Sequence, residues 1–174
     1  MKDIKEYIRT VPDYPVEGIN FYDMNSLFAG PKFNDAIYEL VQSSEKLYKT
    51  PTHIVGIESR GFVVGSAMAN SFGLPLVMVR KKGAKYPGEL LEETYTLEYG
   101  KATLTLQTGL LGHTDRCIVV DDLVATGGSV EATKTLIERT GAKVLGVSTI
   151  VDLVYARNGN NLSVPITALL REFE

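Results

Sequence analysis

The chain has 174 residues, of which 44% are hydrophobic and 22% are charged, and 18 Lys and Arg against 21 Asp and Glu give a net charge of −3. This composition is typical of one folded domain, and the slight acidic excess argues against a nucleic-acid partner, which usually requires a basic excess. One cysteine, Cys117, excludes an intramolecular disulfide, and no apolar run reaches the ~18 residues of a membrane helix. We therefore expect a protein of the cytoplasm with no membrane partner.

The first fifty residues predict two helices with an irregular segment between them. Residues 3–10 place Ile4 and Ile8 at helical spacing, and prolines end that helix. Residues 16–30 mix Gly, Asn and Asp with isolated apolar residues, which predicts an ordered loop or short strand that can cover a site. Residues 31–49 predict an amphipathic helix with Pro31 at its start. Its apolar positions are Phe33, Ile37, Leu40, Val41 and Leu47.

The rest of the chain alternates apolar runs typical of buried strands with helical segments. The first strand–helix–strand unit is predicted at residues 53–58, 61–73 and 74–79, and the second at residues 117–122, 127–140 and 143–153. Between them, residues 82–107 are polar, contain several glycines and alternate in hydropathy, which predicts a long β-hairpin. The pattern predicts an α/β fold, a mostly parallel sheet flanked by helices, in a single domain spanning residues 1–174.

The most informative motif is Val119–Ser129, with the sequence VVDDLVATGGS. An apolar strand ends in Asp121 and Asp122, and a turn of small residues then opens a helix. In parallel sheets ligands bind at such turns, where backbone N–H groups and the helix N-terminus favour a phosphate. Thr126 and Ser129 add hydroxyl donors, whereas the two carboxylates accept hydrogen bonds from sugar hydroxyls. The motif therefore predicts a binding site for a phosphorylated sugar.

Two competing phosphate-binding motifs are absent from the sequence. Gly56 and Gly61 have the glycine spacing of a Walker A loop, but Phe62 and Val63 stand where that loop requires Lys and Ser or Thr. No GxGxxG follows a predicted strand. These observations argue against a nucleoside triphosphatase and a dinucleotide-dependent enzyme.

The segment from Asp121 to Ser129 resembles the phosphoribosyl-pyrophosphate (PRPP) motif of type I phosphoribosyltransferases. Residues 58–62 (ESRGF), 80–88 (RKKGAKYPG) and 95–101 (YTLEYGK) resemble the purine-specific branch of that family, in the family order. The resemblance implies a type I phosphoribosyltransferase fold with an N-terminal hood over about residues 1–30 and a flexible hairpin lid over about residues 82–107. It also implies a homodimer that transfers the 5-phosphoribosyl group of PRPP to a purine, with adenine as the first expectation.

The resemblance also assigns roles to individual residues. Arg60 would contact the pyrophosphate, which suits the planar donor fork of a guanidinium, and Glu98 would manage a proton near N7 of the purine. Mg²⁺ is implied as the cofactor, held mainly through PRPP and pyrophosphate with no dedicated protein ligand. The residues expected to bind PRPP or AMP are Ser59, Arg80, Lys81, Lys85, Asp121, Asp122, Ala125, Thr126, Gly127, Gly128 and Ser129.

The segment expected to bind the purine departs from the family pattern. Phe21 resembles the aromatic residue that stacks on the base, but Asn20 and Tyr22 stand where the family usually has an aliphatic and a basic residue. Adenine offers an amino donor and an N1 acceptor, whereas hypoxanthine offers an O6 acceptor and an N1–H donor. Substitutions in this segment can therefore change which base is bound. The alternatives are a hypoxanthine, guanine or xanthine transferase, or a non-catalytic PRPP-binding regulator. The regulator is disfavoured because the N-terminal residues show neither a helix-turn-helix pair nor a basic bias.

Overall fold

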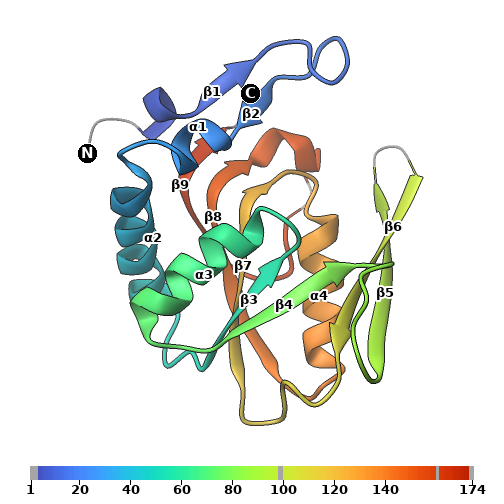
Figure 1. Ribbon diagram of the computed structural model, residues 1–174. Helices are drawn as coiled ribbons and strands as arrows, with labels where there is room; N and C mark the ends of the chain where they lie inside the picture. Colours follow the sequence, from blue (N-terminus) through green and yellow to red (C-terminus); the bar gives the residue numbers. More distant parts are fainter. Residues whose placement is uncertain (1–3, 98–99, 160, 173–174) are drawn as a thin grey trace.

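The computed structural model describes residues 4–97, 100–159 and 161–172, and its centre is a seven-stranded sheet (Figure 1). The strand order is β5-β6-β4-β3-β7-β8-β9. The parallel strands are β3 (His53–Ile57), β4 (Leu76–Lys81), β7 (Arg116–Val124), β8 (Lys143–Leu153) and β9 (Ile166–Glu172). The hairpin β5 (Leu90–Leu97) and β6 (Gly100–Gln107) joins β4 in antiparallel register. The predicted mostly parallel α/β sheet is confirmed, and residues 82–107 contain the predicted hairpin.

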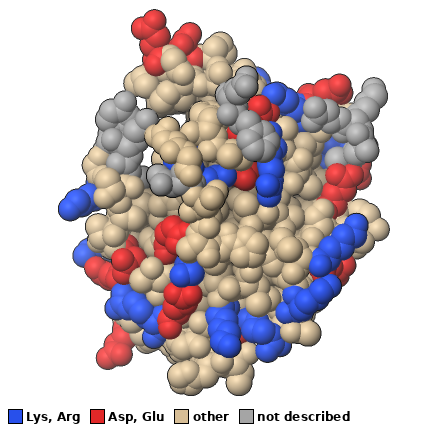
Figure 2. All heavy atoms as spheres, turned by 180° about the vertical axis from the view of Figure 1, so that it is seen from behind, with Lys and Arg blue, Asp and Glu red and all other residues tan. Residues whose placement is uncertain are grey.

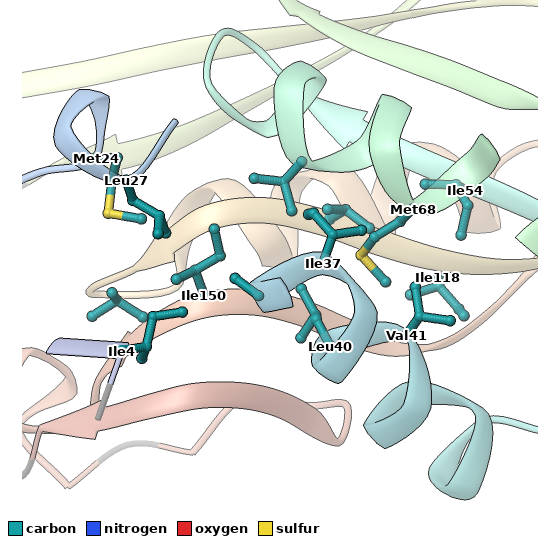
Figure 3. Packing of buried hydrophobic residues seen from close by; sticks show 14 of the residues in the cluster. Ile4, Met24, Leu27, Ile37, Leu40, Val41, Ile54, Met68, Ile118 and Ile150 are labelled. Atoms are coloured by element: carbon teal, nitrogen blue, oxygen red, sulfur yellow. The ribbon is translucent and has the colours of Figure 1, made fainter. Parts of the chain in front are cut away.

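Helices cover both faces of this sheet. α2 (Phe33–Leu47) and α3 (Gly61–Phe72) pack in one hydrophobic cluster, and α4 (Gly128–Glu138) packs in a second cluster with β6. Side chains alternate across a strand, so Ile118 of β7 lies in the first cluster and Val119 in the second. Figure 3 shows the first cluster, in which α2 and α3 face the central strands. Both faces are buried, which explains why the strand sequences are nearly continuous apolar runs.

The N-terminal segment lies above the edge where the parallel strands end (Figure 1). A 3-10 helix, Ile4–Tyr7, leads into β1 (Arg9–Val11), which pairs with β2 (Phe21–Asp23) and is followed by α1 (Asn25–Phe28). The predicted helix over residues 3–10 is therefore wrong beyond Tyr7. Pairing with β2 and the 2.6 Å ion pair between Arg9 and Asp23 override the local helical spacing.

Smaller differences concern α2 and the C-terminal strand. α2 begins at Phe33 after the N-cap Lys32, so Pro31 lies outside the helix, and Leu47 is half exposed although its position predicted burial. Ser44 is buried instead, because its hydroxyl donates to the Leu40 carbonyl and pairs with Ser148 of β8. β9 was not predicted, since its sequence does not alternate in hydropathy.

The surface carries charges of both signs. On the face seen in Figure 2, the described Lys and Arg side chains lie among Asp and Glu side chains around a largely uncharged centre. This distribution agrees with the small net charge of −3. In the described part of the chain, no helix is both long and apolar enough to cross a membrane.

Candidate active site

The predicted phosphate-binding turn follows β7 in the middle of the sheet. Asp121 and Asp122 lie within β7, which continues to Val124, so the prediction that the strand ends at the two acids is wrong by two residues. The longer strand is explained by its partner, because Val124 is still paired with Asp152 of β8. The turn consists of Ala125, Thr126 and Gly127, and α4 begins at Gly128.

Backbone geometry leaves the start of α4 suited to an anion. Gly127 is the N-cap and has φ +86°, a conformation that glycine adopts without strain. No side chain caps the helix, so the N–H groups of its first turn are not taken up by a cap. Together with the helix dipole, these N–H groups can bind a phosphate, and Ser129 lies in the same turn.

The two carboxylates of β7 are held in unusual electrostatic surroundings. Burial raises the pKa of Asp121 well above its ordinary value, and the neighbouring charge of Asp122 raises it further. Burial also raises the pKa of Asp122, while the guanidinium of Arg60 opposes that rise. Nε of Arg60 lies 3.0 Å from Oδ2 of Asp122, whose side chain is 4% exposed. Buried acids of this kind gain most from ligands that donate hydrogen bonds, as sugar hydroxyls do.

Arg60 reaches these acids because the loop before α3 approaches β7 closely. A Cβ at Gly61 would lie 2.8 Å from the Val120 carbonyl oxygen and 2.9 Å from Oδ1 of Asp121, so only glycine fits. Ser59 and Arg60 precede that glycine, and Arg60 is the N-cap of α3. Cζ of Arg60 also lies 5.8 Å from the ring centroid of Phe21. Arg60 therefore stands between the two carboxylates and the N-terminal segment.

The predicted basic residues at the end of β4 and directly after it divide into two groups. Glu58, beside Ser59, accepts a 2.9 Å hydrogen bond from the backbone N–H of Lys81 and lies 3.4 Å from Nε of Arg80. The guanidinium of Arg80 also lies 5.2 Å from the ring centroid of Tyr86. The structure thus brings Arg80 to the loop that carries Arg60, whereas the side chains of Lys81 and Lys85 are exposed to solvent.

A cavity of about 500 Å³ joins the N-terminal segment to the phosphate-binding turn. Asn20, Ala125 and Thr126 line it, as sequence reasoning predicted for one site, and so do Leu153 and Tyr155, which it missed. Leu153 ends β8 and Tyr155 follows it, and the carboxyl end of β8 is adjacent to that of β7, so the rule for ligand sites in parallel sheets could have identified both residues.

The other two residues expected to bind the purine are placed differently from Asn20. Phe21 is partly buried and makes an edge-to-face contact with Tyr14, with ring centroids 5.1 Å apart. The side chain of Tyr22 is 8% exposed and lies in the core, so its backbone is the part left for a ligand.

The hairpin contacts the phosphate-binding turn through a residue that was not predicted. A Cβ at Gly128 would lie 2.8 Å from Cδ2 of Tyr95 and 3.3 Å from the Thr96 carbonyl oxygen. Burial raises the pKa of Tyr95, and the nearby charge of Asp121 raises it further. Glu98, the predicted catalytic acid, lies outside the described residues.

The described residues supply few side chains that could ligate Mg²⁺. Among the described residues, no three His, Cys, Asp or Glu side chains form a group that could hold a metal. Asp121 and Asp122 are adjacent, but Arg60 already pairs with Asp122. This set is too small for an all-protein cage, and it fits an ion that keeps waters and substrate oxygens as ligands.

Comparison with known proteins identifies the class to which this site belongs. Residues 23–160 match the family described as "Phosphoribosyl transferase domain", and the chain belongs to that family. Within it, the chain is similar to the adenine phosphoribosyltransferase of Rhodospirillum rubrum, at 40% identity over 170 residues and 97% of each chain. It is also 44% identical over 153 residues to the adenine phosphoribosyltransferase of Yersinia pseudotuberculosis, covering 88% of this chain and 81% of the relative.

Solved structures of the same family share the fold. The adenine phosphoribosyltransferase of Rhodothermus marinus superposes with a TM-score of 0.84 at 38% identity, covering 97% of this chain and 96% of the other. The enzyme of Saccharomyces cerevisiae, crystallised with an imino-altritol bisphosphate and adenine, superposes with a TM-score of 0.85 at 34% identity over 97% of each chain. The type I phosphoribosyltransferase fold expected from the sequence is confirmed.

Proposed function

We propose that the protein transfers the 5-phosphoribosyl group of PRPP to adenine, giving AMP and pyrophosphate in purine salvage. The observation that carries this proposal is the uncapped start of α4 beside the carboxylates of Asp121 and Asp122 and the guanidinium of Arg60, all at the carboxyl edge of the parallel sheet. The choice of adenine is supported by relatives that bear the name adenine phosphoribosyltransferase and cover nearly the whole chain.

The first step is the binding of PRPP. Its 5-phosphate accepts hydrogen bonds from the backbone N–H groups of Gly127, Gly128 and Ser129 and from the hydroxyls of Thr126 and Ser129. The ribose hydroxyls donate to Asp121 and Asp122, which otherwise bury negative charge at a cost. The pyrophosphate lies at the loop that carries Ser59 and Arg60.

The chemical step exchanges one bond to C1 of the ribose for another. The bond from C1 to the pyrophosphate oxygen breaks and its electron pair leaves with pyrophosphate, while N9 of adenine forms the new bond and the purine loses its ring proton. Arg60, with Arg80, Lys81 and Lys85, stabilises the departing negative charge. Positive charge develops on the sugar, as in other glycosyl transfers, and the Asp122 carboxylate, paired with Arg60, would stabilise that charge when the ribose is bound beside it.

The purine is placed by the N-terminal segment. Phe21 stacks on the ring, the backbone from Asn20 to Tyr22 pairs with its edge, and the cavity lined by Asn20 and Ala125 receives it. Glu98, near N7, accepts the proton that the purine ring loses as N9 bonds to C1. In this proposal residues 1–30 are a hood and residues 82–107 a lid of one domain spanning residues 1–174, and closure of the lid excludes water that would hydrolyse PRPP.

The proposal also includes a metal ion, an oligomeric state and a cellular location. Mg²⁺ would be held mainly through PRPP and pyrophosphate, with no dedicated protein ligand, and would supply positive charge that offsets part of the substrate's negative charge. The chain works as a homodimer, which light scattering after size-exclusion chromatography would test. It acts in the cytoplasm on small-molecule substrates.

The proposal is tested by incubating the protein with PRPP, Mg²⁺ and each purine in turn and following pyrophosphate release. Fastest release with adenine, together with formation of AMP, is the expected result. Turnover with hypoxanthine, guanine or xanthine and not with adenine would contradict the adenine assignment, and the polar Asn20 would then be the first residue to exchange. PRPP binding without turnover of any purine would instead favour a non-catalytic regulator.

A further inference from the structure

A buried ion pair lies beneath the phosphate-binding turn and has no part in the mechanism above. We infer that Arg157, held by Asp152, is a positioning residue that fixes the shape of the turn Ala125–Gly127 and so sets the affinity for the 5-phosphate. This inference rests on the proposed function, because it takes the turn to be the site of that phosphate. Arg157 ends the short 3-10 helix Val154–Arg157 that follows β8.

The pair is one of the most enclosed charged groups among the described residues. Nη1 of Arg157 donates to Oδ1 of Asp152 at 2.6 Å, and the two side chains are 7% and 1% exposed. The same Nη1 also donates a longer hydrogen bond, 3.4 Å, to the carbonyl oxygen of Ala125. One guanidinium nitrogen therefore ties the carboxylate at the end of β8 to the first residue of the turn.

The stem of the same arginine lies near the other end of the turn. Gly127 presents its Cα toward the Leu162 side chain and Arg157, so a Cβ there would meet Leu162 and lie 3.9 Å from Cδ of Arg157. The turn is thus held by Arg157 at Ala125, through the hydrogen bond to the carbonyl, and it passes close to the arginine stem at Gly127. No side chain caps α4, so its first N–H groups stay available to a ligand while Arg157 holds the Ala125 carbonyl.

The composition of the pair indicates a role beyond stability. Oδ2 of Asp152 receives no hydrogen bond from the described residues, and Nε of Arg171 is 3.8 Å away. Burying an incompletely paired carboxylate is costly, and well-packed apolar residues often replace buried ion pairs without loss of stability. What apolar residues cannot supply is a donor for the Ala125 carbonyl. Because Asp152 balances its charge, Arg157 acts on the shape of the turn and adds little net charge.

The test compares ligands for the two halves of PRPP. Isothermal titration calorimetry with ribose 5-phosphate probes the turn, and titration with pyrophosphate and Mg²⁺ probes the loop of Arg60. Arg157→Gln should raise the dissociation constant of ribose 5-phosphate about tenfold, as expected for loss of a charged hydrogen bond, with pyrophosphate binding unchanged. Arg157→Lys, which keeps the charge but not the fork, should lose less.

Matched variants separate positioning from folding. Arg171→Gln removes the other arginine near Asp152, whose guanidinium donates to the Ile166 carbonyl of β9, and should leave both affinities unchanged. If Arg157→Gln fails to fold, Asp152→Asn combined with Arg157→Met removes the whole pair, leaves no unpaired charge, and should show the same selective loss.

Kinetics give an independent readout of the same inference. In steady state the Arg157 variants should raise KM for PRPP and change kcat little, because the turn binds a part of PRPP that does not react. Equal affinities for ribose 5-phosphate in wild type and variants, or equal losses for both ligands, would overturn the inference. Failure of the wild type to convert PRPP and adenine would contradict the proposed function, and the binding comparison would still decide the role of Arg157.

Discussion

The phosphate-binding turn and the lid, residues 82–107, are built in opposite ways. The turn follows the central strand β7, and distant parts of the chain contact it, through Arg157 and Leu162 on one side and Tyr95 on the other. The lid is a hairpin at the edge of the sheet, held in part by partly exposed ion pairs of Lys82 with Glu92 at 2.7 Å and of Arg139 with Glu93 at 3.6 Å.

Under the proposed function, this difference places phosphate binding on a firmly held turn and enclosure of the substrate on the edge hairpin. A turn fixed from several sides keeps its N–H groups aimed at one point, which favours tight and specific binding of a phosphate. The exposed ion pairs of this hairpin contribute little stability, whereas Leu104 and Leu106 of its inner strand β6 are fully buried in the second cluster, so the outer strand β5 is the part that can open at the lower cost. The binding groups therefore belong on the turn, and the group that must enclose the substrate belongs on the lid.

The largest effect is expected where two parts of the rigid region meet. Gly61→Ala places a Cβ against the Val120 carbonyl and Asp121, both of which are difficult to move, and so shifts Arg60 away from the acids. Such a displacement should lower kcat/KM about 100-fold, which steady-state kinetics will measure. Gly112→Ala is the control, because a Cβ there meets nothing within 4 Å, and it should leave activity unchanged. Normal activity of Gly61→Ala would show that the close approach is not required.

The contact between the two regions should give an intermediate effect. Gly128→Ala forces its Cβ against the ring of Tyr95, and we expect a roughly tenfold lower kcat/KM because the lid no longer seats on the turn. Tyr95→Ala removes the ring, so the double variant should be more active than Gly128→Ala alone. A double variant as impaired as the product of the single variants would mean that the two residues do not interact.

Asp121 should lower the stability of the folded protein at neutral pH. Burial raises the pKa of Asp121 in the folded chain, so folding holds its proton more tightly and the stability of the wild type falls as pH rises through that raised pKa. Asp121→Asn removes this penalty. We expect the variant to melt at a higher temperature than the wild type at neutral pH, with a difference that disappears in acid, and to bind PRPP more weakly. A lower melting temperature at neutral pH would refute this explanation.

The smallest effect is expected on the lid. Lys82→Ala removes the ion pair with Glu92, in which the two side chains are 62% and 44% exposed. Its loss should lower the free energy of unfolding by about 0.5 kcal/mol or less, and high salt should abolish the difference in urea denaturation. A loss of several times that size would indicate that the lid is as firmly fixed as the turn.

Periodicity predicted the central fold well but not the segments stabilised by distant partners. The two strand–helix–strand units appear as β3–α3–β4 and β7–α4–β8, because their strands are buried on both faces. Residues 9–11 form a strand against β2, and β9 exists because it can pair with β8. Local sequence does not reveal such partners.

For the site, the motif predicted the turn from Ala125 to Ser129 and the neighbouring acids, and the structure brings Arg60 to them. Tyr95 and Arg157 were missed, because each acts through a contact with a glycine or a carbonyl that is remote in the sequence. Gly128 was predicted from the phosphate-binding motif, and the structure adds a second reason for glycine, because a Cβ there would meet Tyr95 of the lid. Roles that depend on such packing are visible only after folding.

The proposed roles of the turn in PRPP binding and of the lid in catalysis are best tested by comparing Ser129→Ala with Glu98→Gln in one experiment. The dissociation constant of PRPP and the single-turnover rate with saturating adenine would be measured for both variants. Ser129→Ala should weaken PRPP binding and leave the rate nearly unchanged, while Glu98→Gln should keep the affinity and lower the rate about 100-fold or more. Loss of affinity in Glu98→Gln with an unchanged rate would contradict these roles.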